Sequence, residues 1–310
     1  MNYFPGKKTF LPWILEGVKE MKWGKYTPYI LLIPTLVIII LFIYWPAVSS
    51  FMLSFYKVSP FGDIKIFVGF DNFLNLFKSK TYLNAIKVTV IYILVTVFSV
   101  IFLGYLIALL LDNKVFGVKF YRTLIFTPYA ISFTIAGALW TFMLNPVAGH
   151  INYFLNRFFG ISANWLTSQP FALISVMVTS IWKMLPFSII FYLAGLQSIP
   201  EEVIESSIID GANNWQRIWK IKFPILSPTT FYLIIMEITH AMFDSFGIID
   251  IMTRGGPVES TTTMIYRLYL DSFYFQKTGE AAAQSVILFI IMCFITFFYF
   301  KFGEKSVHYQ

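Results

Sequence analysis

Residues 201–226 read "EEVIESSIIDGANNWQRIWKIKFPIL" and form the most charged stretch of a chain that is 57% apolar and only 13% charged. Pro200 suits the first turn of a helix, and the acidic residues that follow it favour a helix N-terminus. Asp210-Gly211 is a turn signal, because glycine tolerates left-handed backbone angles. The stretch therefore predicts two short amphipathic helices around a tight turn.

The second of these helices is expected to begin near Asn214 and to end at Pro224, before the next apolar run. By helical spacing, one face of it carries Trp215, Ile218, Trp219 and Lys222. Two exposed tryptophans suggest a surface for a partner protein. A helix lying on lipid headgroups also uses Trp and Lys, so physical chemistry alone leaves both interpretations open.

Six long apolar runs occupy most of the remaining chain, at about 29–52, 86–111, 120–144, 171–195, 227–251 and 281–301. About 20 mainly apolar residues are needed to cross the hydrocarbon core of a bilayer. A buried helix of a soluble protein is usually shorter and polar on one side, and a soluble domain has about a quarter charged residues. The sequence predicts an all-α, polytopic membrane protein with six transmembrane helices.

Lys and Arg are more numerous in one set of alternating loops than in the other. With the N-terminus inside, the inside segments hold 13 of the 23 basic residues and the outside loops hold 8. Positive residues favour the cytoplasmic side. Both termini and the 201–226 stretch are therefore expected in the cytoplasm. Within the N-terminal segment 1–28, residues 13–25 suggest an interfacial helix, with a frayed basic tail as an equal alternative.

Sequence signatures of enzymes and of metal sites do not occur. The chain has no Gly-x-x-x-x-Gly-Lys-Ser/Thr, so it cannot build the usual backbone cradle for ATP phosphates. The single cysteine, Cys293, lies in an apolar run, and the three histidines are scattered. We expect no catalytic residues, no metal and no cofactor in this chain, and the net charge of +7 needs no nucleic acid to explain it.

The 201–226 stretch resembles the signature loop of binding-protein-dependent ABC importer permeases. The resemblance rests on Glu205-Ser206-Ser207, on Asp210-Gly211-Ala212, and on Ile218, Ile221 and Pro224. The family has two alanines where this chain has Ser206 and Ser207, and a leucine at Phe223. The resemblance implies a loop that docks on an ATP-hydrolysing subunit. The residues expected to couple to that subunit are Glu205, Asp210, Gly211, Ala212, Trp215, Ile218, Trp219, Ile221 and Pro224.

The resemblance continues over nearly the whole chain after residue 29. "NPVAGHINYFLN" and "LAGLQSIPEEVIE" are similar to the carbohydrate-uptake type of these permeases, and "TRGGPVESTTTMIYRLY" is the most specific match. It implies a type I permease fold over 29–310, with a core at about 85–300 and a coupling loop at 200–224. The implied substrate is sn-glycerol-3-phosphate, with a sugar or oligosaccharide as the alternative. A self-sufficient secondary transporter is less consistent with the chain, which shows no inverted repeat.

The same resemblance implies a set of partners and a location. The partners are a second permease subunit, two copies of an ATPase subunit that would bind ATP and magnesium, and an extracytoplasmic solute-binding protein. The location is the bacterial cytoplasmic (inner) membrane, and the chain would form half of a translocation pore.

Ionisable residues inside apolar runs usually face a protein interior or a water-filled path. Glu237, His240 and Asp244 share one face of the fifth run by their spacing, and Lys183 lies in the fourth run ahead of Pro186. Pro186 is expected to kink its helix. Two hypotheses stay open: the charged groups line the substrate path, or Lys183 pairs with Asp244 or Glu237 to lock two helices.

Positions just before the Gly-Gly-Pro loop contact sugar in maltose-type relatives. In this chain those positions are Phe243, Asp244 and Phe246. Together with Lys183, Glu237 and His240 they form the predicted substrate path. Gly255, Gly256 and Pro257 form a rigid turn that the resemblance implies lies next to the binding protein, although a plain exposed turn would have the same sequence.

Overall fold

The computed structural model describes residues 27–60, 62, 64–112 and 118–303. The chain divides into two compact units, Met1–Met52 and Leu53–Gln310. The predicted interfacial helix at 13–25 lies outside the described residues.

The described part of the first unit is one apolar helical run. It consists of α2 (Thr27–Ile39), a π-helical turn η1 (Ile40–Tyr44) and α3 (Trp45–Leu53). The segment Tyr29–Leu53 is long and apolar enough to span a membrane, and none of its most apolar part is buried inside the protein. Its large apolar side chains, such as Phe42 at 74% exposure, therefore suit a lipid environment.

The second unit begins with a small β-hairpin that the sequence did not predict. Strands β1 (Tyr56–Val58) and β2 (Lys65–Phe67) pair antiparallel, and α4 (Asp71–Lys78) follows them. The amide of Asn72 donates to the carbonyl oxygens of Ser54 at 2.8 Å and Tyr56 at 3.0 Å. This buried amide joins α4 to the chain that enters the hairpin.

Four of the predicted membrane spans are helices of the second unit. They are α5 (Lys80–Asp112), α9 (Phe171–Gln197), the pair α13 (Ser227–Phe243) and α14 (Ser245–Met252), and α16 (Thr278–Gly303). Within the described residues, five helices are long and apolar enough to cross a membrane, counting Tyr29–Leu53 in the first unit. The helix α9 continues without a break through Pro186.

The predicted span at 120–144 is not one helix. It consists of α6 (Val118–Ala130) and α7 (Phe133–Met143), whose segments meet at 111°. Pro128 lies in the last turn of α6, where it cannot donate a backbone hydrogen bond. Ser132 then caps α7 by accepting a hydrogen bond from the Ile135 amide at 3.2 Å. If this bent pair counts as one span, the prediction of six spans holds.

The helices α5 and α9 form the centre of the second unit. A methyl group added at Gly104 of α5 would lie 2.8 Å from Cβ of Ser188 on α9, so the two backbones approach closely at this point. Toward one end of the helices, the core around them includes Tyr105, Ile189 and Tyr192, all 1% exposed or less. The middle of α9 therefore packs closely against α5.

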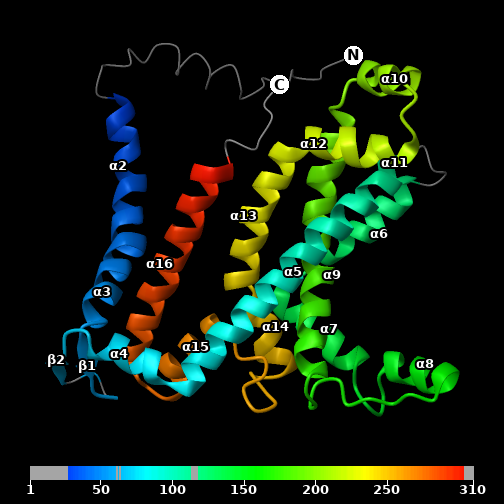
Figure 1. Ribbon diagram of the computed structural model, residues 1–310. Coiled ribbons are helices and arrows are strands. Elements are labelled where there is room, and N and C mark those ends of the chain that lie inside the picture. The colour runs from blue at the N-terminus through cyan, green and yellow to red at the C-terminus, as the bar shows by residue number, and fades with distance from the viewer. Residues whose placement is uncertain (1–26, 61, 63, 113–117, 304–310) are drawn as a thin grey trace, which may run out of the picture. The chain divides into compact units, whose positions relative to one another are not determined.

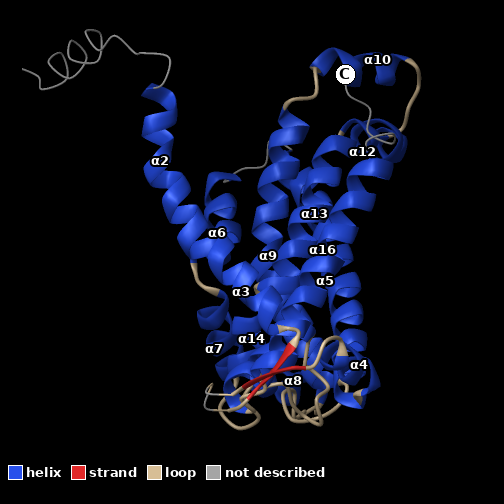
Figure 2. Cartoon of the chain, turned by 90° about the vertical axis from the view of Figure 1, so that its left-hand side faces the viewer, coloured by secondary structure: helices blue, strands red, loops and turns tan. Residues whose placement is uncertain are grey.

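Shorter elements gather at opposite ends of the unit (Figures 1 and 2). At one end lie α10 (Glu201–Ile209), α11 (Asn214–Gln216), the π-helical η2 (Arg217–Lys222) and α12 (Phe223–Ile225). At the other end lie the hairpin, α4, α8 (His150–Phe159), α15 (Met264–Tyr269) and η3 (Leu270–Tyr274). These two ends are called the α10 end and the hairpin end.

Candidate functional site

A cleft of about 290 Å³ opens at the break between α6 and α7. Its walls come from α6, α7, α9, α13 and the linker between the first two helices. The lining residues are Tyr129, Ile131, Phe133, Lys183, Met184, Phe187, Glu237 and His240. Three of the predicted substrate-path residues, Lys183, Glu237 and His240, therefore face one cavity.

The Lys183 ammonium group holds the end of α6. Its Nζ donates to the backbone carbonyl of Tyr129 at 3.2 Å. It also lies 5.1 Å from the ring centre of Tyr129 and 4.9 Å from that of Phe133, one ring on each side of the break. Such cation–π contacts stabilise by about 0.5–2 kcal/mol. The buried lysine, at 4% exposure, thus contacts both helices of the broken span.

The ion-pair lock between two helices, one of the two hypotheses that the sequence left open, is not formed in this structure. Among the described residues, the structure has no ion pair between Lys183 and either Asp244 or Glu237. Asp244 instead pairs with His240 one turn earlier, with 2.6 Å between Nδ1 and Oδ2. Both residues of that pair are partly exposed, so it is a modest local contact rather than a buried link between helices.

Glu237 has one satisfied and one unsatisfied oxygen. The Ser188 hydroxyl donates to Oε1 at 2.7 Å. The other oxygen, Oε2, has no hydrogen-bond partner among the described residues, although Glu237 is fully buried at 0% exposure. A buried acceptor without a partner costs roughly 1–3 kcal/mol, so this carboxyl group has unused hydrogen-bonding capacity at the wall of the cleft.

The other three predicted substrate-path residues do not line this cleft. Asp244 separates α13 from α14. Phe243 is 38% exposed, and Phe246 packs against Tyr266 and Tyr269 at ring distances of 5.9 and 4.8 Å. Helical spacing placed Asp244 on the face of Glu237 and His240 because it does not register the break after α13, whereas Phe243 and Phe246 were placed by family resemblance.

The predicted turn at the α10 end is present. Gly211 has a φ of +80°, and the amide of Ala212 donates to the Ser207 carbonyl at 2.9 Å, which closes the end of α10. Asn213 then begins the next helix through a capping box with Gln216. The α10 helix exposes Ile208 and Ile209, at 53% and 86%. These two isoleucines form an apolar surface that the sequence had not assigned to a partner.

The prediction of two exposed tryptophans is half wrong. Trp215 is 70% exposed, but Trp219 packs between helices, with ring distances of 5.6 Å to Tyr105 and 5.6 Å to Phe223. The Tyr105 hydroxyl also donates to the Ile218 carbonyl at 2.7 Å. Trp219 and Ile218 therefore attach the loop to α5. The ring of Trp215 still lies 5.6 Å from that of Trp219, as their helical spacing predicts, but only Trp219 reaches α5.

The sequence predicted that Pro224 ends the second helix, and this prediction is wrong. Helical structure continues from η2 into α12 and stops at Leu226. In the π-helical turn before it, the amide of Phe223 reaches back five residues to the Ile218 carbonyl. This wider turn precedes the proline in the first turn of α12, the position where a missing N–H is tolerated.

A second cleft, of about 510 Å³, lies behind α10. It is lined by the ends of α5 and α9, by α10 and by η2. Glu205, a predicted coupling residue, is in its wall. Lys222 and Asp112 form an ion pair at 3.2 Å across one side of it. The α10 helix therefore stands away from the membrane helices instead of packing flat on them.

The Gly-Gly-Pro loop lies at the hairpin end and is held from several sides. Gly255 has a φ of +80°, and a methyl group there would lie 2.5 Å from the Thr262 hydroxyl oxygen. The amide of Asn84 on α5 donates to the Glu259 carbonyl at 3.0 Å, and that of Gln169 donates to the Pro257 carbonyl at 3.1 Å. The tip of the loop is open to solvent, since Val258 is 89% exposed.

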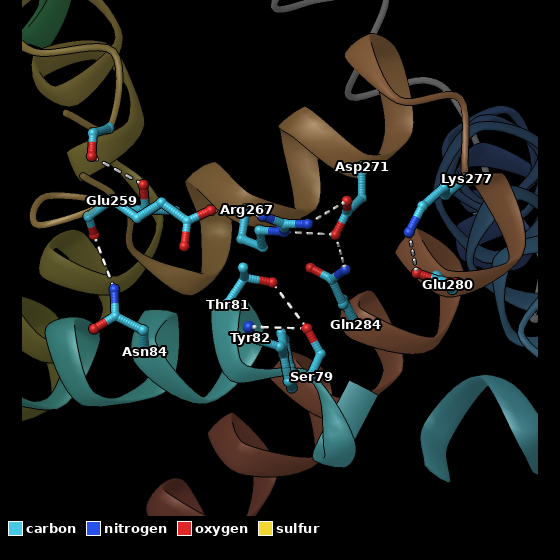
Figure 3. A network of polar contacts seen from close by, with 12 residues as sticks. Ser79, Thr81, Tyr82, Asn84, Glu259, Arg267, Asp271, Lys277, Glu280 and Gln284 are labelled. Carbon is cyan, nitrogen blue, oxygen red and sulfur yellow. Dashed lines mark hydrogen bonds and ion pairs between the residues drawn. The ribbon is translucent and has the colours of Figure 1, made fainter. Parts of the chain in front are cut away.

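A charge network that is buried at Asp271 and more open at Glu259 supports this loop (Figure 3). Arg267 donates to Glu259 at 3.1 Å and makes two bonds to Asp271, at 2.9 and 3.0 Å. Gln284 of α16 donates to Asp271 at 2.6 Å. Sequence reasoning missed this network, although the spacing of four residues between Arg267 and Asp271 is a signal for a helical ion pair.

Burial raises the pKa of Tyr266, and the neighbouring Asp250 carboxylate adds to the effect. The phenol therefore stays protonated and donates to Asp250 at 3.1 Å. This bond fixes α15 against α14 below the loop.

Comparison with known proteins gives consistent matches over almost the full chain. The family model of the binding-protein-dependent transport system inner membrane component matches residues 26–309. A protein of Rhizobium meliloti, the sn-glycerol-3-phosphate transport system permease protein UgpA, is 42% identical over 92% of this chain and 97% of its own length. The Salmonella typhi protein of the same name is 37% identical over 93% of this chain and 97% of its own.

Solved structures have the same fold. A chain of a bacterial ABC transporter involved in the import of the acidic polysaccharide alginate superposes with a TM-score of 0.77, at 24% identity, over 94% of this chain and 98% of that one. A second structure of the alginate transporter, in complex with a periplasmic protein bound to an alginate pentasaccharide, also gives 0.77, at 25% identity, over 92% and 95%. With a mainly helical membrane fold, a bent third span and family similarity over residues 26–309, the chain belongs to the binding-protein-dependent transport system inner membrane components, the permease subunits of ABC importers.

Proposed function

We propose that this chain is the permease subunit that carries sn-glycerol-3-phosphate through an ATP-driven, binding-protein-dependent importer. The observation that carries the proposal is the cleft at the α6–α7 break, where a buried lysine has no carboxylate partner among the described residues. A phosphate group needs such a cation. Relatives named for sn-glycerol-3-phosphate transport are 37–42% identical over more than nine-tenths of the chain.

In this proposal the substrate passes through the cleft at the α6–α7 break. Lys183, Glu237 and His240 contact the substrate, while Phe243 at the end of α13 and Asp244 directly after it lie farther toward the hairpin end. A second, related permease completes the pore on the open side of the cleft. The two permeases alternate between access from outside and access from the cytoplasm.

The α10 end is the proposed contact with the ATPase subunits, one for each permease. Ile208, Ile209 and Trp215 offer exposed apolar area beside the acidic start of α10. Large exposed side chains of this kind are typical of partner surfaces. ATP and magnesium bind in the ATPase subunits, and closure of the ATPase pair moves the α10 helices together. Both termini and the α10 end face the cytoplasm of a bacterium.

The Gly-Gly-Pro loop is the proposed contact with the solute-binding protein. Its backbone is fixed by Asn84, Gln169 and the Arg267 network, and its tip Val258 is exposed. A rigid loop loses little conformational entropy on binding, which favours recognition. The alginate transporter relative has been solved together with a periplasmic protein.

Uptake by the assembled transporter tests the substrate. The chain is produced with its second permease, ATPase and binding protein, and uptake of radiolabelled sn-glycerol-3-phosphate is compared with that of a neutral disaccharide. ATP-dependent uptake of sn-glycerol-3-phosphate alone supports the proposal. Uptake of the disaccharide alone would assign the chain to sugar import, and uptake without the ATPase would contradict the importer class.

A further inference from the structure

One side chain from another helix, Lys183 of α9, contacts both sides of the joint between α6 and α7. The last carbonyl groups of a helix have no partners within it. The Tyr129 carbonyl, near the end of α6, finds one in the Lys183 ammonium at 3.2 Å. The same ammonium lies over the rings of Tyr129 and Phe133, which belong to different sides of the joint. Lys183 therefore ties α9 to both halves of the broken span.

This ammonium group keeps unused donors. A lysine has three N–H donors, and within the described part of the chain the structure gives it one hydrogen-bond acceptor and no ion-pair partner. It is nevertheless 4% exposed and forms part of the cleft wall. A buried cation that no carboxylate contacts directly is unfavourable, so the cleft has room for the charge of an anion beside Lys183.

The same cleft offers an unused acceptor. Glu237 is fully buried, its Oε1 is held by Ser188, and its Oε2 has no partner in the described part of the chain. A carboxylate repels a phosphate but accepts hydrogen bonds from hydroxyl groups. The cleft thus presents a cation with free donors and a carboxylate with a free oxygen, which complements a small molecule that has an anionic group and hydroxyl groups.

We infer that the phosphate of the substrate binds the free donors of Lys183 while this lysine still holds the Tyr129 carbonyl, and that the substrate hydroxyls bind Oε2 of Glu237. The bound anion then links α9 to the α6–α7 joint through one ammonium group. The α6–α7 joint is therefore stiffer when the cleft is occupied than when it is empty. A neutral polyol cannot produce this effect, because it has no anionic group to bind Lys183. The inference deepens the proposed function and rests on it for the identity of the substrate.

Electron paramagnetic resonance on the joint tests this inference. Ala130, the exposed last residue of α6, is changed to Cys in a Cys293→Ser chain and labelled with a nitroxide, in the complete transporter in lipid nanodiscs. We expect sn-glycerol-3-phosphate to reduce the mobility of the label, inorganic phosphate to do so at higher concentration, and glycerol to have no effect.

Variants separate the two roles of the lysine. Lys183→Met should increase label mobility without any ligand and abolish the response to both anions. Lys183→Arg, which keeps the charge, should restore part of both properties. Lys87→Met, which removes an exposed lysine of α5 outside the cleft, should behave as the unchanged chain. Glu237→Gln should leave the ligand-free mobility unchanged and weaken the response to sn-glycerol-3-phosphate more than that to inorganic phosphate.

Two results would overturn the inference. Equal ligand-free mobility in the Lys183→Met and unchanged chains would remove the role of Lys183 at the joint. An undiminished anion response in Lys183→Met would remove its role in binding phosphate. Neither result depends on the substrate that is finally transported, so failure of sn-glycerol-3-phosphate uptake would contradict the proposed function separately.

Discussion

Lys183 shows how one residue can be recognised as important before its role can be known. A charged side chain inside an apolar run is costly, so the sequence already requires a partner for it. Helical spacing offered only Asp244 and Glu237 as partners on α13. The structure provides a backbone carbonyl and two aromatic faces instead, because the break of the third span brings Tyr129 and Phe133 to the lysine.

The double change Lys183→Met with Asp244→Asn should not restore transport. In the structure, Asp244 pairs with His240, so the second change does not remove a charge that the loss of Lys183 has left unpaired. Loss of a hydrogen bond to a charged group costs about 1.5–3 kcal/mol, so Lys183→Met should lower uptake by about ten- to a hundredfold. Initial uptake rates of the single and double variants should agree, with Lys87→Met as the control. Recovery in the double variant would favour the helix lock.

The two tryptophans of the loop should differ in what they do. Trp219→Ala removes a side chain packed on Tyr105 and Phe223 and should destabilise the protein by about 3 kcal/mol, the lower end for such changes. Trp215→Ala removes an exposed ring and should leave stability nearly unchanged while weakening binding of the ATPase. Thermal unfolding of the purified complex and copurification of the ATPase measure these effects. Equal thermal stability in both variants would contradict the finding that Trp219 is packed and Trp215 is exposed.

At the scale of elements, the loop between α9 and α13 combines a free helix with an anchored one. The α10 helix stands over a cleft of about 510 Å³ and exposes two isoleucines. The run from α11 to α12 packs on α5 through Trp219 and Phe223. A force applied to α10 would therefore reach the membrane helices through the turn at Gly211, and the geometry of this turn should matter for coupling.

Gly211→Val should uncouple the loop without removing the protein from the membrane. Gly211 has a φ of +80°, and a Cβ added there would meet no other group of the described residues within 4 Å, so the strain is confined to the backbone. That strain is about 1–2 kcal/mol for an ordinary residue. Membrane abundance should stay normal, while ATPase binding and uptake fall. Gly211→Asn is the matched control, because asparagine tolerates left-handed angles better, and normal uptake in the valine variant would exclude the turn from coupling.

At the scale of the molecule, the two ends of the second unit have different characters. The hairpin end has short strands, a fixed loop and a charge network (Figures 2 and 3). The α10 end has exposed apolar side chains on a helix that stands away from the rest. This difference fits a protein whose ends contact different partners in different compartments.

Cysteine accessibility in intact cells tests the orientation. In a Cys293→Ser chain, Val258→Cys and Tyr153→Cys should react with an impermeant maleimide from outside, because both positions are well exposed at the hairpin end. Ile209→Cys and Asn214→Cys, at the α10 end, should react only after the cells are opened. Labelling of position 209 or 214 from outside would reverse the orientation and remove the proposed contact with the ATPase.

The sequence by itself determined the class of this protein. The number of apolar residues needed to span a membrane is set by the thickness of the bilayer, so spans can be found from the sequence. Five of the predicted runs correspond to helices long enough to span. The turn at Gly211 was also predicted, since the requirement for a left-handed angle is local. The signature residues of the loop led to the permease family, which the comparisons confirm.

Tertiary structure alone decided where the site lies. The break at Ile131 depends on a proline and a serine cap whose combined effect is visible only when α6 and α7 each pack against α9. Trp219 is packed while its neighbour Trp215 is exposed because only Trp219 meets α5, and Phe246 lies outside the cleft because it packs on α15. Spacing along one helix gives the face on which a residue lies, but packing across the whole chain determines which other helix contacts that face.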